Sequence, residues 1–252
     1  MAAFASLLVA SAATLRVASL NLCSDDYALL LARPGEVVSV SKLAKDPLES
    51  PLAPLARGIA GNRGRIEDVL AVRPTLVLTM GGGGRSSAAI ARTMGMRVVD
   101  LASPMTLDEV AGNLTRVATA FGDPQRAKPW LTRLAALRRS APVRQEDAIW
   151  LGGGGLTLSP GSLGAQWLVL AGMRQRALPG GRATLETLVR TPPKILVQSD
   201  YRSGQLSQGQ RWLDHPLLRA LPSRRIATDG RQWTCAGPLM IEEIERLRRV
   251  AR

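Results

Sequence analysis

The 252-residue sequence has a single histidine, two cysteines and few aromatic residues, which make up 4 % of the chain. It contains no G-x-S-x-G elbow, no H-E-x-x-H motif and no cluster of histidines and cysteines at metal-ligand spacing. The single histidine, His215, precedes Pro216 at the start of a predicted helix, a position typical of capping or packing. We therefore predict neither an enzyme nor a resident metal or cofactor.

Long apolar runs are also missing, so nothing in the sequence predicts an integral membrane protein. The N-terminal "MAAFASLLVASAATLRV" has an apolar stretch too short for a membrane span, which needs about 20 residues. Ala10-Ser11-Ala12 matches a small-x-small cleavage pattern, although no lysine or arginine precedes the apolar stretch. We predict a signal peptide at residues 1–13 and an exported, periplasmic protein. The alternative is a frayed N-terminal segment of a cytosolic protein.

Acidic residues are few: 20 stand against 33 basic residues, which gives a formal net charge of +13. Such an excess indicates an anionic partner, which could be nucleic acid, a membrane surface or an acidic small molecule. The sequence has no dense basic run, and a solvated, arginine-rich surface is the plainer interpretation.

Cys23 and Cys235 lie far apart in the sequence. In an exported protein two such residues are natural disulfide partners, whereas in a cytosolic protein they would be ordinary small buried residues.

Strand-like runs alternate with helical patterns through most of the chain. The expected strands are 16–22, 36–41, 75–80, 96–101, 147–152, 194–200 and 224–230. The expected helices are 24–36, 65–73, 86–95, 106–122, 123–140, 162–173, 184–191, 211–221 and 237–252. This alternation predicts an α/β protein with two lobes, 14–122 and 143–252, each a mainly parallel sheet flanked by helices. One long helix, within 123–142, joins them, and the ligand cleft lies between the lobes, beyond the carboxyl ends of the strands.

Two tetraglycine runs, Gly81–Gly84 and Gly152–Gly155, each follow a predicted strand. Glycine there permits positive φ and a close approach to the backbone. Neither run continues into a phosphate-binding motif, so tight turns at the cleft rim are favoured over nucleotide binding.

The same local unit occurs once in each half of the chain. Glu67 stands seven residues before Pro74, and Glu186 stands seven residues before Pro193; each proline leads into a short apolar strand. A carboxylate in the first turn of a helix is stabilised by about 0.3–1 kcal/mol, which alone would account for either glutamate. That effect does not explain why the setting is repeated.

With these units, the chain resembles a class III periplasmic substrate-binding protein of the ferric-siderophore and cobalamin ABC importers. The resemblance extends over the segments "RVASLNLCSDDYALLLARPGEVVSVS", "IEDVLAVRPTLVLTM", "LETLVRTPPKILVQ" and "WTCAGPLMIEEIERL". It implies two lobes joined by a stiff helix, small closure on ligand binding and no chemistry. It also implies that one glutamate per lobe, here Glu67 and Glu186, docks onto arginines of the permease dimer.

The family binds metal chelates between its lobes, and position along the chain nominates five residues for this role. They are Arg57, Arg85, Tyr201, Arg202 and Trp233, since aromatic faces suit the body of a chelate and guanidinium groups suit its oxygens. Within this resemblance, a disulfide between Cys23 and Cys235 would tie the floor of the cleft.

The basic charge places a ferric siderophore ahead of cobalamin, and haem third because a lone histidine is a poor axial ligand. We expect a monomer without nucleic acid. Two other classes stay open: a polyanion or nucleic-acid binder, suggested by the charge, and a cytosolic α/β enzyme that uses the glycine-rich turns.

Overall fold

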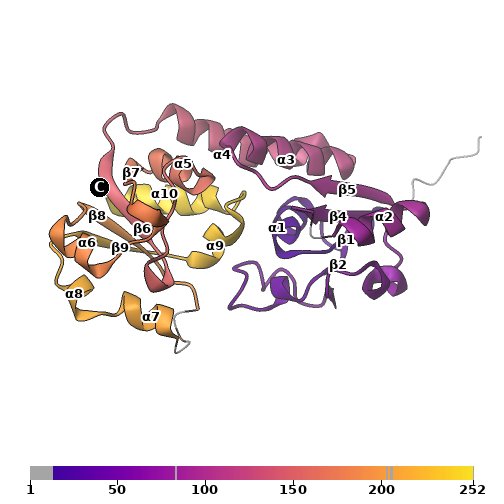
Figure 1. Cartoon of the computed structure of the whole chain (residues 1–252). Coiled ribbons are helices and arrows are strands. Elements are labelled where there is room, and N and C mark those ends of the chain that lie inside the picture. The colour runs from indigo at the N-terminus through magenta and orange to yellow at the C-terminus, as the bar shows by residue number, and fades with distance from the viewer. Residues whose placement is uncertain (1–13, 83, 203, 205–206, 252) are drawn as a thin grey trace, which may run out of the picture.

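The computed structural model describes residues 14–82, 84–202, 204 and 207–251. The predicted signal peptide at residues 1–13 lies outside these described residues. The chain forms two lobes side by side, each built on its own parallel sheet (Figure 1).

The first lobe contains a five-stranded parallel sheet with the order β3-β2-β1-β4-β5. Its strands are β1 Val17–Ser19, β2 Val37–Ser41, β3 Ala60–Asn62, β4 Leu76–Met80 and β5 Arg97–Leu101. Its helical segments are α1 Leu22–Leu31, η1 Leu43–Lys45, η2 Ile66–Val72 and α2 Arg85–Thr93. The strand β4, between β1 and β5, is buried along its whole length, because separate apolar clusters cover the two faces of the sheet.

The second lobe contains a four-stranded parallel sheet with the order β7-β6-β8-β9. Its strands are β6 Glu146–Leu151, β7 Met173–Gln175, β8 Ile195–Ser199 and β9 Arg224–Thr228. Its helical segments are η4 Gly153–Gly155, α5 Leu163–Leu170, η5 Pro179–Gly181, α6 Leu185–Arg190, α7 Gln208–Leu213, α8 Pro216–Arg219, α9 Gly230–Cys235 and α10 Met240–Ala251. Two apolar clusters again cover its faces. The predicted α/β fold with two helix-flanked parallel sheets is thus confirmed.

Several local predictions were wrong in detail. The edge strands β3 and β7 were not predicted, because three residues give too short an alternation to stand out. The first helix begins at Leu22, two residues before the expected start, and Asn21 is its N-cap. The segment expected as one helix at 211–221 divides into α7 and α8 before Pro216.

The helix expected to join the lobes is present as α4 Lys128–Arg139, and a second helix, α3 Leu107–Ala120, lies beside it (Figure 1). The connecting segment consists of η3 Pro124–Ala127 and α4. Near the start of α3, Leu107 and Val110 pack in the second lobe, and further along Leu114 and Val117 pack in the first. The helix α4 runs the opposite way, with Leu131 packed against the first-lobe cluster and Leu134 in the second-lobe core. Each helix therefore has apolar anchors in both lobes.

Ion pairs hold α4 to both lobes as well. Arg126, just before α4, donates to Glu36 of the first lobe, with Nη2 2.8 Å from Oε1. Arg133 pairs with Glu245 of α10 in the second lobe at 2.7 Å. The connection is therefore restrained at both ends by polar and apolar contacts.

A disulfide joins Cys23 in α1 to Cys235 at the end of α9, with 5.3 Å between their Cα atoms. The sequence left two roles open for these cysteines, disulfide partners or small buried residues, and the structure shows the disulfide. Beside it, the indole N–H of Trp167 donates to the carbonyl of Ala236 at 2.8 Å. The lobes are thus tied covalently at a point remote in sequence from the connecting helices.

We expect replacement of both cysteines by serine to lower the free energy of unfolding by up to about 5 kcal/mol. The bond closes a loop whose ends are 212 residues apart, and opening it increases the conformational entropy of the unfolded chain. Urea unfolding of the oxidised protein and the Cys23→Ser/Cys235→Ser variant measures the difference, with reduced wild-type protein as the control. Equal unfolding midpoints for the oxidised and variant proteins would contradict this expectation.

Candidate functional site

The carboxyl ends of the two sheets face each other, because segments that follow strands of one sheet contact segments that follow strands of the other. Cys23 follows β1 and Cys235 lies in the helix after β9. The hydroxyl of Tyr201, after β8, donates a hydrogen bond to Glu49 of the first lobe. The guanidinium of Arg231, after β9, donates to the carbonyl of Pro47 in the same first-lobe loop. Parallel sheets place ligand sites at this edge of their strands.

A cavity of about 690 Å³ lies at the carboxyl ends of β1 to β4 in the first lobe. Its lining carries four cationic side chains and one half-exposed apolar one, which are Lys42, Arg63, Arg65, Arg85 and Leu43. Among the described interactions only Arg65 has an ion pair, with Asp68 at 3.7 Å. An anion entering this cavity would meet several positive charges that no carboxylate already neutralises.

Buried amide side chains shape the walls of this first-lobe cavity. The Asn62 side chain donates to the Ser19 carbonyl at 2.8 Å and to Ser39 Oγ at 2.9 Å, and accepts from the N–H of Gly64. The Asn21 side chain donates to the carbonyl of Met80 at 2.8 Å. These bonds fix the turns after the strands, from which the basic side chains project.

A smaller cavity, of about 440 Å³, lies at the carboxyl ends of β8 and β9 in the second lobe. Pro47 and Leu48 of the first lobe contribute to its wall. Its cations are paired with acids: Arg231 contacts Asp229 at 2.6 Å, and Arg246 contacts Glu243 at 2.6 Å. This cavity is therefore electrostatically more balanced than the first.

The structure brings three of the five nominated ligand-binding residues to this region. Arg85 lines the first-lobe cavity, and Arg202 lines the second. Tyr201 is adjacent to Arg202 and is 36 % exposed.

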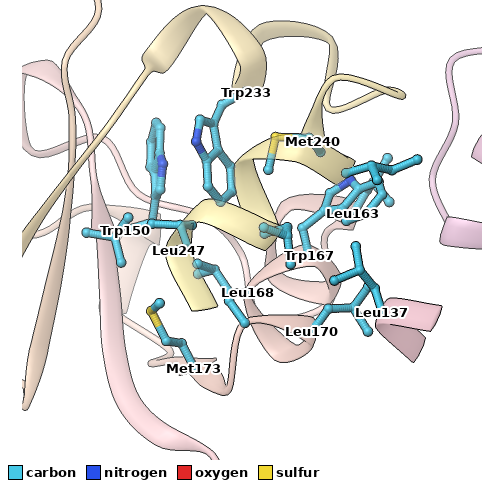
Figure 2. Packing of buried hydrophobic residues seen from close by; sticks show 14 of the residues in the cluster. Leu137, Trp150, Leu163, Trp167, Leu168, Leu170, Met173, Trp233, Met240 and Leu247 are labelled. Atoms are coloured by element: carbon cyan, nitrogen blue, oxygen red, sulfur yellow. The ribbon is translucent and has the colours of Figure 1, made fainter. Parts of the chain in front are cut away.

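Trp233 and Arg57 lie apart from these two cavities. Trp233 is buried in the second-lobe core, where its ring lies 5.6 Å from that of Trp150 and its N–H donates to Thr228 (Figure 2). It lies in α9, which the sequence did not predict. Arg57 lines a separate cavity with Arg16 and Gly35, which precede β1 and β2, so it lies at the amino ends of the strands.

Described glycines of both runs lie in turns that pack against neighbouring atoms. Gly82 has φ of 74°, and a Cβ there would lie 2.8 Å from Nε of Arg85, so glycine lets that guanidinium lie over the turn. In the second run, a Cβ on Gly155 would lie 2.2 Å from the carbonyl oxygen of Ala183. The close approach at Gly155 is by the chain's own backbone.

His215 caps a helix, as expected, with its Nδ1 accepting from the N–H of Leu217. Within the described residues, no three or more histidine, cysteine, aspartate or glutamate side chains gather in a way that could hold a metal ion.

Asp25 and Asp26 are fully or almost fully buried in α1, beside the disulfide. A carboxylate in the first turn of a helix interacts favourably with the helix dipole, but this does not account for their burial. In the structure, Oγ of Ser41 donates to Asp25 at 2.5 Å, and the Ser41 backbone N–H donates at 3.2 Å. Ser41 ends β2, directly before Lys42, so Asp25 supports the wall of the first-lobe cavity.

Glu67 and Glu186 are exposed and occupy equivalent positions in the two lobes. Glu67 lies in η2, which leads into β4, and Glu186 lies in α6, which leads into β8. The strand β4 lies between β1 and β5, as β8 lies between β6 and β9. The repeated sequence unit is therefore a repeated crossover of the fold.

The periplasmic binding protein family model matches residues 17–156, which is more than half of the chain. The chain belongs to the periplasmic binding protein family. None of the curated proteins compared with it matches significantly.

Solved structures share the fold of this periplasmic binding protein along nearly its whole length. The periplasmic heme-binding protein HutB of Vibrio cholerae matches with a TM-score of 0.74 and 18% identity, over 95% of this chain and 99% of that one. The heme-binding protein RhuT from Roseiflexus sp. RS-1 gives 0.66 and 21%, over 94% and 99%. The vitamin B12 binding protein BtuF of Vibrio cholerae gives 0.62 and 18%, over 93% and 95%.

Across the described part of this periplasmic binding protein, no helix combines the length and the apolar character needed to span a bilayer.

We expect the free energy of unfolding to fall as the pH rises from about 4 to 8, because of the buried carboxyl groups. Burial raises the pKa of Asp25 to about 7, and burial together with the Asp25 charge raises the pKa of Asp26. The folded state therefore keeps protons that the unfolded state releases near pH 4, and this stabilisation is lost as the pH passes the folded pKa. The contribution of Asp25 is at most roughly 4 kcal/mol.

Urea unfolding at a series of pH values measures this slope in the wild type and in Asp25→Asn. The variant should show a flatter dependence, whereas Asp108→Asn, at an exposed position, should follow the wild type. A wild-type stability that rises steadily from pH 5 to 8 would exclude a protonated buried carboxyl.

Proposed function

We propose that this chain is a periplasmic substrate-binding protein that holds an anionic metal chelate, foremost a ferric siderophore, between its lobes and delivers it to an ABC importer. The observation that carries the proposal is the first-lobe cavity, which faces the other lobe and is lined by Lys42, Arg63, Arg65 and Arg85. Guanidinium groups bind carboxylate and catecholate oxygens, and their charges repel a bare metal cation. A metal enclosed by anionic oxygens suits such a site.

Apolar side chains complement these charges. Leu43 and Leu48 are each 48 % exposed, and each lines one of the two cavities. Chelates combine charged oxygens with an apolar body, and ligand sites commonly pair apolar walls with a few polar groups. The 42–49 segment contributes to both cavities, which supports one ligand that contacts both lobes.

Haem is the second candidate, and a specific residue favours it. Tyrosine is an axial ligand to haem iron in some proteins, and Tyr201 lies at the side of the cleft with its hydroxyl toward the other lobe. Structures that share this fold include periplasmic heme-binding proteins. The basic cavity suits haem propionates as well as siderophore oxygens. Cobalamin, which is nearly neutral in its corrin body, gains less from these cations.

The proposal also assigns the repeated carboxylates. Glu67 and Glu186 stand on equivalent crossovers of the two lobes, both exposed, and Glu186 forms only a surface ion pair with Arg190. A surface pair of this kind contributes little stability, so it can exchange for a partner's arginine. We propose that each glutamate docks on one subunit of the permease dimer.

Tryptophan-fluorescence titrations with a ferric tris-catecholate, haem and cobalamin test the ligand. We expect the ferric chelate to bind most tightly, and we expect Arg63→Gln with Arg85→Gln to weaken its binding at least about tenfold through loss of two charge-assisted contacts. Arg57→Gln is the control, because Arg57 lies at the amino ends of the strands, and it should leave the affinity unchanged. Tight binding of cobalamin alone would overturn the proposed ligand class.

Uptake assays test the docking role. Glu67→Arg with Glu186→Arg should abolish transport, because two arginines would face the arginines of the permease, while the affinity for the chelate stays at the wild-type value. Glu109→Arg, in the first turn of α3, is a matched control for adding arginine near a helix start. Transport at the wild-type rate by the double variant would remove this role from the two glutamates.

A further inference from the structure

The carboxylate of Glu49, in the first lobe, is bound by two side chains of the second lobe. Glu49 accepts a hydrogen bond from the hydroxyl of Tyr201 and forms an ion pair with Arg202. Its side chain is only 12 % exposed, although it belongs to a surface loop. A phenol O–H and a guanidinium that converge on one carboxylate form a carboxylate-binding site.

The backbone of the second lobe holds this site in place. Tyr201 and Arg202 follow β8 directly, and Arg202 has φ of 53°, in the left-handed region that residues other than glycine rarely adopt. Such a conformation persists where the surrounding structure fixes it, commonly at ligand-contacting positions. Arg202 also lines the second-lobe cavity, so the cation that binds Glu49 is one that an entering ligand would meet.

The segment that carries Glu49 is an ordered turn. Asp46 accepts from the backbone N–H groups of Glu49 at 3.0 Å and Ser50 at 2.9 Å through its carbonyl, and from Leu48 at 2.8 Å through its side chain. Arg231 of the second lobe donates to the carbonyl of Pro47. We call residues 46–50 the strap, because they reach from the first lobe to the second beside the cavity.

We propose that Glu49 is a built-in competitor of the anionic ligand: its carboxylate occupies the Tyr201–Arg202 site and must leave when a ligand oxygen takes that site. The inference rests on the proposed function, since it assigns the ligand a second anionic contact in the same cleft. Displacement exchanges the Glu49 carboxylate for an anionic oxygen of the ligand at the same cation. Neutral ligands cannot make this exchange, so the competition from Glu49 weakens the binding of anionic ligands and leaves that of neutral ligands largely unchanged.

Glu49→Gln tests the competition in the full-length protein. The amide keeps the size of the side chain but removes the nearer of the two carboxylates beside Arg202, the other being Asp46 at 3.9 Å. We therefore expect a ferric tris-catecholate to bind about tenfold more tightly than to the wild type. A ferric trihydroxamate without negative charge should change by less than about twofold. Asp108→Asn removes one carboxylate from an exposed pair with Arg138 and controls for the change in net charge.

Tyrosine absorbance tests the contact itself without any ligand. The chain has two tyrosines: Tyr27 is fully buried, whereas Tyr201 is 36 % exposed and contacts Glu49. Burial and the neighbouring Glu49 carboxylate raise the pKa of Tyr201. Glu49→Gln should therefore lower it, and Glu49→Asp should restore part of the shift.

The outcomes separate this inference from the proposed function. If the chelate binds wild type and Glu49→Gln equally, or more weakly to the variant, the competition is refuted while chelate binding stands. If neither protein binds any chelate, the proposed function fails, and the competitive role fails with it. An unchanged pKa of Tyr201 in Glu49→Gln would show that the contact does not form in solution, which also overturns the inference.

Discussion

The attachment of the two lobes at separate points is the constraint on which the rest of the structure depends. The antiparallel helices α3 and α4 each have apolar anchors in both lobes, and the Cys23–Cys235 bond joins strand-end helices far from them in sequence. Together they keep the carboxyl ends of two separate sheets opposite each other. A basic cavity in one lobe can therefore act with a site in the other, which a single flexible linker would not ensure.

Charge is distributed unequally across the cleft. In the first-lobe cavity, the described interactions include no ion pair for Lys42, Arg63 or Arg85, whereas Arg202, Arg231 and Arg246 of the second lobe all contact carboxylates. An anion can enter the first cavity without displacing an acid, but it must exchange with one in the second. The net charge of +13 describes the whole surface, and this local pairing determines where an anion gains most.

The sequence predicted the α/β class, the two sheets and the repeated glutamate–proline unit, because each depends on local periodicity and punctuation. It did not predict the surroundings of single residues. Trp233 was expected at the cleft, but it packs on Trp150, and their contact joins segments more than 80 residues apart. Lys42 and Arg63 follow β2 and β3, and they could be identified as residues of one cavity only from the sheet order, in which these two strands are neighbours. The role of Asp25 in the cavity wall could be recognised only from its tertiary contact with Ser41.

The repeated crossover shows how one sequence pattern serves two sheets of different size. The first sheet has the additional edge strand β3. In both sheets, however, the helical segment with the glutamate leads into the strand that pairs with the first strand of that lobe in the sequence: η2 leads into β4 beside β1, and α6 leads into β8 beside β6. Parallel pairing fixes the direction of each crossover, so the helix start that carries the glutamate comes at the carboxyl-end side of each sheet. Since these ends face each other across the cleft, ligand binding and the spacing of Glu67 and Glu186 depend on the same arrangement of the lobes.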